Sequence, residues 1–402
     1  MKIAFICLSL SLWTIPSNAD QSGHFDRIWT ESSAQIYPLE KSHQFSDSKR
    51  QELRSLAQKA ENAEALAATL NPFLLSMGVS HTYLYQDHDP NYYMLRSLFT
   101  TRDLKSPKIH HLGMQLEKSN SGYVVRTVLE GYPAARAGLR RGDKLLRVNG
   151  KVFHPFDSFN PRQKKIELVY SRDEKEVPVR VKSIFESPHE SFWNATQKSA
   201  RILSADGKKI GYIHLWSGTN EKFLKTLKTT VLKKFRNTDG LILDLRDGFG
   251  GAWWDYLDPF FPDSSTYFKP TMITRAGKGE EQQAPARRNS PYYEKPMVVI
   301  INEGVRSGKE AIAYQFKKTK RAQLIGTPTA GAFAMGKGIF ADDKESYLLY
   351  LSTGEILLDG NKIEGHPIQP DVSVPFPLDG KLSSDPQFET ALEVLKQNLG
   401  RY

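Results

Sequence analysis

The feature that most constrains the fold is a regular alternation of strand-type and helix-type segments between about residues 196 and 336. The expected strands are Ile210–Leu215, Leu241–Leu245 and Met297–Ile301, and the expected helices are Glu221–Phe235 and Gly308–Lys318. Strands that alternate with helices predict a mainly parallel sheet covered by helices. The sequence therefore predicts an α/β core in this part of the chain.

The segments before this core differ from it in composition. The 402 residues are too many for one compact core, so several domains are expected. Residues 20–104 are predicted to be largely helical, because Gln51–Leu75 carries leucine and alanine at helical spacing. Residues 105–183 are dense in short β-type runs and glycines, which predicts a β-domain. The fold class is thus a multidomain α/β (α+β) protein.

The last part of the chain, residues 184–402, contains the α/β core and a tail. In the tail, strands are predicted at Ser346–Leu351 and Glu355–Leu358, and a final helix is predicted at Pro386–Gln397. The stretch Arg275–Tyr293 is rich in Gly, Gln, Arg and Pro, which predicts a surface loop.

The first nineteen residues have the pattern of a secretory signal peptide. Lys2 precedes the apolar run Ile3–Leu12, and Ser17–Ala19 supplies small residues for a cut after Ala19. No later stretch approaches the ~20 apolar residues that a membrane helix needs. We therefore expect an exported protein of the periplasm or extracellular space, with no integral membrane segment.

Cysteine content and charge exclude several kinds of site. The only cysteine, Cys7, lies within residues 1–19, so the mature chain would have no disulfide, thiolate metal site or cysteine nucleophile. The net charge is +10 and dispersed, and its densest cluster, Lys222–Arg236, is interleaved with apolar residues. That interleaving is typical of a solvated helix face, so no nucleic-acid partner is expected.

Two consecutive strings in the β-domain point to peptide binding. They are Gly131–Leu139 (GYPAARAGL) and Arg141–Gly150 (RGDKLLRVNG). With the run that begins at His111, they strongly resemble a PDZ domain of the bacterial envelope-protease type. The resemblance implies that a peptide adds as a strand to a sheet edge. It also implies that the amides of a short loop capture the terminal carboxylate; here these residues are Leu112, Gly113 and Met114.

A serine at a strand-to-helix turn is the most informative candidate for catalysis. The apolar strand Met297–Ile301 runs into a turn, and Ser307 lies just before the helix that begins near Gly308. Backbone amides and the positive helix end could hold a developing oxyanion there. A serine at this position, taken alone, is more often a helix N-cap.

The neighbouring strings support the catalytic interpretation. Asp239–Arg246, the Gly250-Gly251 pair and Gln323–Ala332, taken with the Ser307 turn, resemble the carboxyl-terminal-processing (tail-specific) peptidase family. The resemblance implies a crotonase/Clp-protease-like α/β core with Ser307 as nucleophile. It also implies an oxyanion hole made by the amides of Gly251 (or Gly250) and Gly308, and no cofactor.

A serine hydroxyl needs an adjacent base, and two candidates are present. Many family members use a lysine 25 residues after the nucleophile. Ala332 occupies that place here, and Lys337 fits only with a short insertion. The other candidate, His81, follows Ser80 and resembles the base of the tricorn-type branch.

In the tricorn-type branch a glutamate orients the histidine through a serine hydroxyl. Glu364 and Ser80 match these two residues. The pattern favours His81 over Lys337. His366 is a weaker third candidate, because nothing pairs it with a serine. No H-E-x-x-H or similar spacing predicts a metal site.

The resulting hypothesis is an exported serine endopeptidase that cleaves protein substrates near their carboxyl ends and recognises them through its PDZ domain. A Ser307/Lys337 dyad peptidase is one alternative. A non-catalytic peptide-binding envelope protein is another, since Arg306, Lys309 and the run Asp247–Phe249 depart from the commonest family pattern. The sequence leaves open the substrate, the oligomeric state and whether the PDZ domain activates or inhibits.

Overall fold

The computed structural model describes residues 21–98, 107–120, 122–159, 165–340, 347–379 and 384–400. The predicted signal peptide lies outside these residues, as does Cys7. Within the described part, no helix combines the length and the apolar character needed to cross a membrane.

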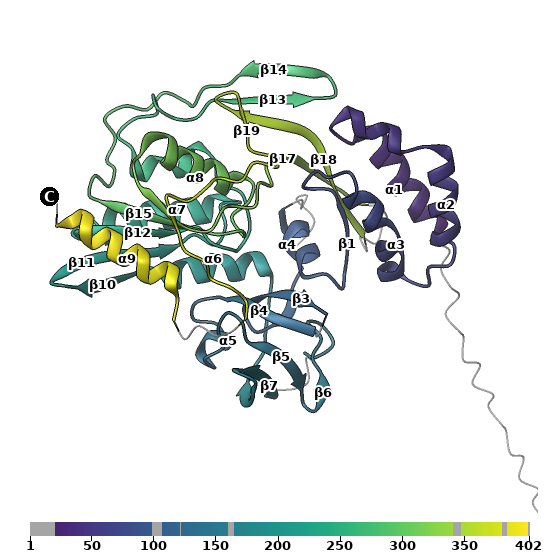
Figure 1. Cartoon of the computed structure of the whole chain (residues 1–402), viewed down its shortest axis with the longest axis horizontal. Coiled ribbons are helices and arrows are strands. Elements are labelled where there is room, and N and C mark those ends of the chain that lie inside the picture. Colours follow the sequence, from purple (N-terminus) through teal and green to yellow (C-terminus); the bar gives the residue numbers. More distant parts are fainter. Residues whose placement is uncertain are drawn as a thin grey trace, which may run out of the picture.

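A six-stranded sheet forms the centre of the second half of the chain (Figure 1). Its strands, in spatial order, are β10 (Arg201–Ala205), β11 (Lys208–His214), β12 (Gly240–Asp244), β15 (Met297–Ile301), β16 (Gln323–Gly326) and β20 (Val372–Ser373). All neighbouring pairs are parallel except β10 with β11. The predicted α/β core with a mainly parallel sheet is confirmed.

Helices cover both faces of this sheet. They are α6 (Pro188–Ser199), α7 (Glu221–Thr229), α8 (Gly308–Thr319) and α9 (Pro386–Leu399), with the π-helical turn η2 (Thr230–Lys234) after α7 and the 3-10 turns η3 (Trp254–Tyr256) and η4 (Asp258–Phe260). On β15, Val299 and Ile301 share a core with α7 and α8, whereas Val298 and Ile300 share another with α9. A strand buried on both faces is continuously apolar, which explains the run that the sequence shows.

A second sheet joins the two ends of the chain. β18 (Tyr347–Leu358) pairs with β1 (Tyr83–Gln86), β13 (Pro270–Thr274), β17 (Ala334–Phe340) and β19 (Asn361–Lys362), and β14 (Gly277–Glu281) pairs with β13. The two strands predicted at residues 346–351 and 355–358 are in fact one, because β13 pairs with β18 from Gly354 onward. The predicted loop 275–293 contains the exposed strand β14, which has no apolar alternation to reveal it.

The N-terminal segment packs on this second sheet. Its elements are α1 (Ser22–Gln35), η1 (Leu39–Gln44), α2 (Asp47–Ala57), α3 (Ala63–Leu75) and α4 (Pro90–Leu98). The helical spacing within residues 51–75 belongs to two helices, because the Asn62 side chain accepts the Ala65 amide and begins α3. Phe25, Leu53 and Leu66 form one core with Leu349 of β18.

The β-domain lies beside the core, as Figure 1 shows. Its sheet runs in the order β3 (Met114–Ser119), β4 (Gly122–Val128), β5 (Lys144–Val148), β7 (Ile166–Arg172) and β8 (Lys175–Val181), with β6 (Lys151–Val152) on β5 and the short helix α5 (Pro133–Arg136) after β4. The short strands β2 (Ile109–His111) and β9 (Ile184–Glu186), which precede and follow this sheet in the sequence, pair with each other in an antiparallel arrangement. β3 is an edge strand of this sheet.

Candidate active site

Ser307 occupies a strained turn between β15 and α8. Its backbone has φ 55° and ψ −138°, and its side chain caps no helix amide. The Ser307 amide donates to the Ala332 carbonyl (2.8 Å). A non-glycine residue at positive φ is uncommon and is held only by the surrounding structure. The side chain is therefore not the ordinary N-cap that this position suggests.

Glycines surround Ser307 closely. A Cβ added to Gly250 would lie 2.7 Å from the Ser307 Cβ and 3.3 Å from its Oγ, and one on Gly308 would lie 2.1 Å from the Ala252 carbonyl oxygen. The amides of Gly250, Gly251 and Gly308 make no hydrogen bond within the described residues. These are the amides predicted to form the oxyanion hole.

Ser80, His81 and Glu364 form a continuous hydrogen-bonded chain. The Ser80 hydroxyl donates to Glu364 Oε2 (2.7 Å) and lies 2.6 Å from His81 Nδ1. The Ser80 amide also donates to Glu364 Oε1 (2.6 Å). Because the hydroxyl proton goes to Glu364, Nδ1 must donate to the hydroxyl oxygen. The free lone pair of the neutral imidazole is then on Nε2, the nitrogen that can accept a proton.

The surroundings of His81 keep the ring neutral. Burial lowers the pKa of His81 to about 4, and the positive charge of Arg306 adds to this effect. The ring lies 5.0 Å, centroid to centroid, from Tyr350 of β18. A neutral imidazole at pH 7 can act as a general base.

One short segment links Ser307 to this chain. Ala332 accepts the Ser307 amide, and the Phe333 amide donates to Glu364 Oε2 (2.6 Å). Among the described residues, no hydrogen bond joins Ser307 and His81 directly. The segment itself is held by the buried Glu310, whose carboxylate accepts from the Thr329 hydroxyl and the amides of Gly331 and Ala332.

Lys337 lies elsewhere. Its exposed side chain donates to Gln35 Oε1 of α1 (2.7 Å) rather than to Ser307. His366 is also exposed, and its Nδ1 lies 3.0 Å from the Glu364 carbonyl oxygen. Of the three candidate bases, only His81 belongs to a carboxylate–hydroxyl–imidazole chain.

Lys309 is a functional candidate that the sequence showed only as a departure from the family pattern. It is fully buried, and its Nζ donates to the carbonyls of Asp247 (2.7 Å) and Leu215 (3.2 Å). Burial lowers the pKa of Lys309 to about 7, although Asp247 and Asp244 oppose that shift. Lys309 thus fixes the start of the segment that leads to Gly250.

The β-domain contacts the same segment. Arg126 Nε donates to Asp247 Oδ1 (2.7 Å), and both Arg126 and Arg141 pair with Glu303 in the turn before Ser307. The Gln115 side chain exchanges two hydrogen bonds with the backbone of Gly248. These pairs depend on the docking of two domains, so no local sequence pattern could have indicated them.

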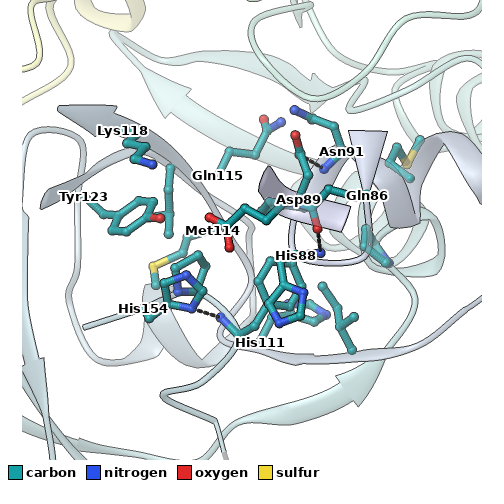
Figure 2. Close-up of a pocket in the computed structure, with 18 of the residues that line it drawn as sticks. Gln86, His88, Asp89, Asn91, His111, Met114, Gln115, Lys118, Tyr123 and His154 are labelled. Atoms are coloured by element: carbon teal, nitrogen blue, oxygen red, sulfur yellow. Dashed lines mark hydrogen bonds between the residues drawn. The ribbon is translucent and has the colours of Figure 1, made fainter. Parts of the chain in front are cut away.

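A cavity of about 810 Å³ connects the predicted peptide-binding loop to this region. Figure 2 shows Met114 and Gln115 of β3 facing it from one side and Gln86, His88 and Asp89 from the other. Leu112, Gly113 and Phe249 also line it. The three predicted loop residues are therefore together in one cavity, which reaches the residue next to Gly250.

One of the three loop amides is already occupied. The Gly113 amide donates to His111 Nδ1 (3.0 Å). Burial lowers the pKa of His111 to about 4, so this nitrogen is an unprotonated acceptor at neutral pH. A carboxylate that used the Gly113 amide would have to displace the His111 ring.

No group of three or more His, Cys, Asp or Glu side chains in the described ranges is arranged to hold a metal ion.

Comparison with known sequences agrees with this arrangement. Residues 209–374 match the model of peptidase family S41, and residues 124–160 match the PDZ domain. The chain is 27% identical over 301 residues to a probable CtpA-like serine protease of Staphylococcus aureus, and 25% identical over 281 residues to one of Staphylococcus haemolyticus. These alignments cover 69% and 66% of this chain, and 55% and 53% of the relatives. The chain thus spans about half the length of these curated relatives.

Solved structures show the same fold. The photosystem II D1 C-terminal processing protease matches with a TM-score of 0.55 at 17% identity, over 94% of this chain and 97% of that one. The tricorn protease matches with a TM-score of 0.53 at 17% identity, over 95% of this chain and 37% of that one. At these identities the likeness concerns the fold. Residues 209–374 are thus similar to peptidase family S41, and residues 124–160 are similar to a PDZ domain.

Proposed function

We propose that this chain is a serine endopeptidase in which Ser307 is the nucleophile and His81 the general base, with Ser80 and Glu364 orienting His81. The observation that carries the proposal is the Glu364–Ser80–His81 hydrogen-bonded chain, linked to Ser307 through Ala332 and Phe333.

Each group has a defined part in an acyl transfer. Ser307 Oγ attacks the scissile carbonyl while His81 Nε2 takes its proton, and the same nitrogen later returns a proton to the leaving amine. The amides of Gly250 or Gly251 and of Gly308 would hold the oxyanion, helped by the positive end of α8. Water then hydrolyses the acyl-enzyme by the reverse sequence of proton transfers.

The PDZ domain would deliver the substrate. β3 is an edge strand that lines the cavity, so an extended peptide can add to it as a strand. From there the cavity reaches Phe249, beside Gly250. The substrates we propose are the carboxyl-terminal regions of unfolded proteins outside the cytoplasm. The signal pattern of residues 1–19 and the D1 C-terminal processing protease among the structural relatives support this proposal.

The first experiment compares casein cleavage by the chain from residue 20 onward with that by its Ser307→Ala, His81→Ala and Lys337→Ala variants. We expect loss of cleavage with Ser307→Ala and His81→Ala but not with Lys337→Ala. If Lys337→Ala loses cleavage and His81→Ala keeps it, Lys337 is the base and the chain is a serine–lysine dyad peptidase. Equal inertness of wild type and Ser307→Ala, with retained binding of peptides, would favour the non-catalytic binding protein.

Two further measurements test recognition and export. A peptide ending in a free carboxylate should be cleaved faster than the same peptide ending in an amide. Fractionation of cells that express the full chain should place the protein, shortened by residues 1–19, outside the cytoplasm. Recovery of the uncut chain in the cytoplasm would contradict export.

A further inference from the structure

Arg306 presents an uncommitted positive charge beside the nucleophile. It directly precedes Ser307, and its side chain is exposed. Its carbonyl oxygen would lie 3.1 Å from a Cβ on Gly250, which places its backbone against the predicted oxyanion residues. Within the described ranges, Arg306 makes no hydrogen bond or ion pair through its side chain.

The nearest acidic residue in sequence is not available to Arg306. Glu303 is held by Arg126 and Arg141, at 3.1 and 3.0 Å. Glu310, one turn into α8, is buried and saturated by the segment 329–332. Neither of the two carboxylates close to it in the chain neutralises Arg306.

The charge of Arg306 acts on the proposed base and on a ring beside it. Burial lowers the pKa of His81, and Arg306 lowers it further. Burial raises the pKa of Tyr350, which contacts His81, and Arg306 opposes that rise. Arg306 therefore lies near enough to His81 and Tyr350 for its charge to act on both.

We propose that Arg306 binds a carboxylate of the substrate next to the scissile bond, and so selects substrates that carry Asp, Glu or the chain's own terminus there. A guanidinium forms paired, charge-assisted hydrogen bonds with a carboxylate and has no need of further partners. This role of Arg306 rests on the proposed peptidase function.

Substrate binding would also act on the base. A carboxylate that neutralises Arg306 removes the charge that disfavours a protonated His81. His81 then becomes a stronger base when an acidic substrate is bound than when the cleft is empty. Selection should therefore appear in kcat as well as in KM.

The test uses pairs of fluorogenic peptides that differ only by Glu or Gln at each position flanking one scissile bond. With the wild type we expect kcat/KM for the best Glu peptide to exceed that for its Gln partner by about 10- to 100-fold. Arg306→Gln should bring the ratio close to one, and Arg306→Glu should invert the preference toward Lys. Arg236→Gln, which removes an exposed arginine of the turn after η2, is the matched control and should keep the wild-type ratio.

A ratio near one in the wild type, or an equal loss on both peptides in Arg306→Glu, would overturn the proposal. Peptides that end in an acid or an amide distinguish the two sources of carboxylate. If the preference that depends on Arg306 is for the acid terminus, Arg306 binds the end of the substrate chain. If it is for an internal Glu, Arg306 binds that side chain.

Binding to Ser307→Ala separates this inference from the proposed function. Fluorescence anisotropy with the same peptides should show tighter binding of the Glu peptide, lost in Ser307→Ala/Arg306→Gln. Absence of cleavage by the wild type with this binding difference intact would refute the peptidase and keep the carboxylate site. A Glu preference that survives in the double variant would assign it to the PDZ domain and refute the role of Arg306.

Discussion

Ala332 and Phe333 are consecutive residues that hold opposite halves of the proposed catalytic machinery. The Ala332 carbonyl accepts the Ser307 amide (2.8 Å), and the Phe333 amide donates to Glu364 (2.6 Å). The position at which the family resemblance implied a lysine is occupied by Ala332, and its backbone holds Ser307. A change that displaces this backbone should disturb the nucleophile and the base together.

Glu310→Ala should destabilise the chain and reduce activity. The carboxylate satisfies two buried donors and one partly buried donor of the segment 329–332, and each unsatisfied buried donor costs about 1–3 kcal/mol. We expect a loss of about 3 kcal/mol or more in the free energy of unfolding, measured by urea denaturation. Glu280→Ala, on the exposed strand β14, should change it by less than about 0.5 kcal/mol. Equal effects of the two substitutions would contradict this role of Glu310.

Ser80→Ala should reduce kcat far more than it changes KM. The hydroxyl joins His81 to Glu364, and without it the Nδ1 proton loses its acceptor. We expect a fall in kcat of about 10²- to 10⁴-fold. Ser204→Ala, at an exposed position of β10, is the control. An unchanged kcat would show that Glu364 and Ser80 have only a structural role.

The acidic limb of the pH profile should lie well below the usual range of histidine. Because the pKa of His81 is lowered to about 4, the ring stays neutral as the pH falls from 7 to about 5. We expect kcat/KM for a neutral peptide to be level over this range and to decline near pH 4. A midpoint at or above 6.5 would mean that His81 is not shielded as described, or that another group is the base.

Lys309→Met should change how stability depends on pH. The pKa of Lys309 is about 7 in the folded chain and 10.5 ordinarily, so the unfolded chain binds more protons between these values. Its contribution to stability therefore rises with pH from about 7 to 10.5. Urea denaturation across this range should show a weaker rise in the variant. An identical slope in both proteins would contradict the low pKa.

Gly250→Ala offers a steric test of the predicted oxyanion hole. Its Cβ would lie 2.7 Å from the Ser307 Cβ, and Gly250 does not have the positive φ that would strain an alanine. We expect a large loss of kcat with the far-ultraviolet circular dichroism unchanged. Gly23→Ala in α1, where nothing lies within 4 Å of the added Cβ, should behave as wild type. Retained activity would place the oxyanion hole elsewhere.

Features that depend on local periodicity could be predicted from the sequence. The continuous apolar run of β15, followed by a helix that begins near Gly308, was enough to locate the turn at Ser307. The break between α2 and α3 has only a weak sequence signal, because it depends on one residue, Asn62, whose side chain caps α3. The strand β14 was missed because every residue in it is exposed and only its hydrogen bonds to β13 define it.

Other features depend on contacts between distant segments. Glu364 and Ser80 could be named from a resemblance, but their hydrogen bond spans 284 positions and has no local signature. The blocking of the Gly113 amide by His111 depends on the orientation of one ring. Arg126, which pairs with Asp247, comes from another domain, so no local pattern explains the departure at Asp247–Phe249.

The pairing of β1 with β18 sets the time at which the proposed peptidase can first act. β1 immediately follows His81, whereas Glu364 lies 284 positions after Ser80, so His81 can be oriented only after Glu364 has been synthesised. A partial chain that contains Ser80, His81 and Ser307 but not Glu364 lacks the carboxylate that orients His81 through Ser80. The proposed peptidase therefore stays inactive during synthesis until the segments around His81 and Glu364 have paired.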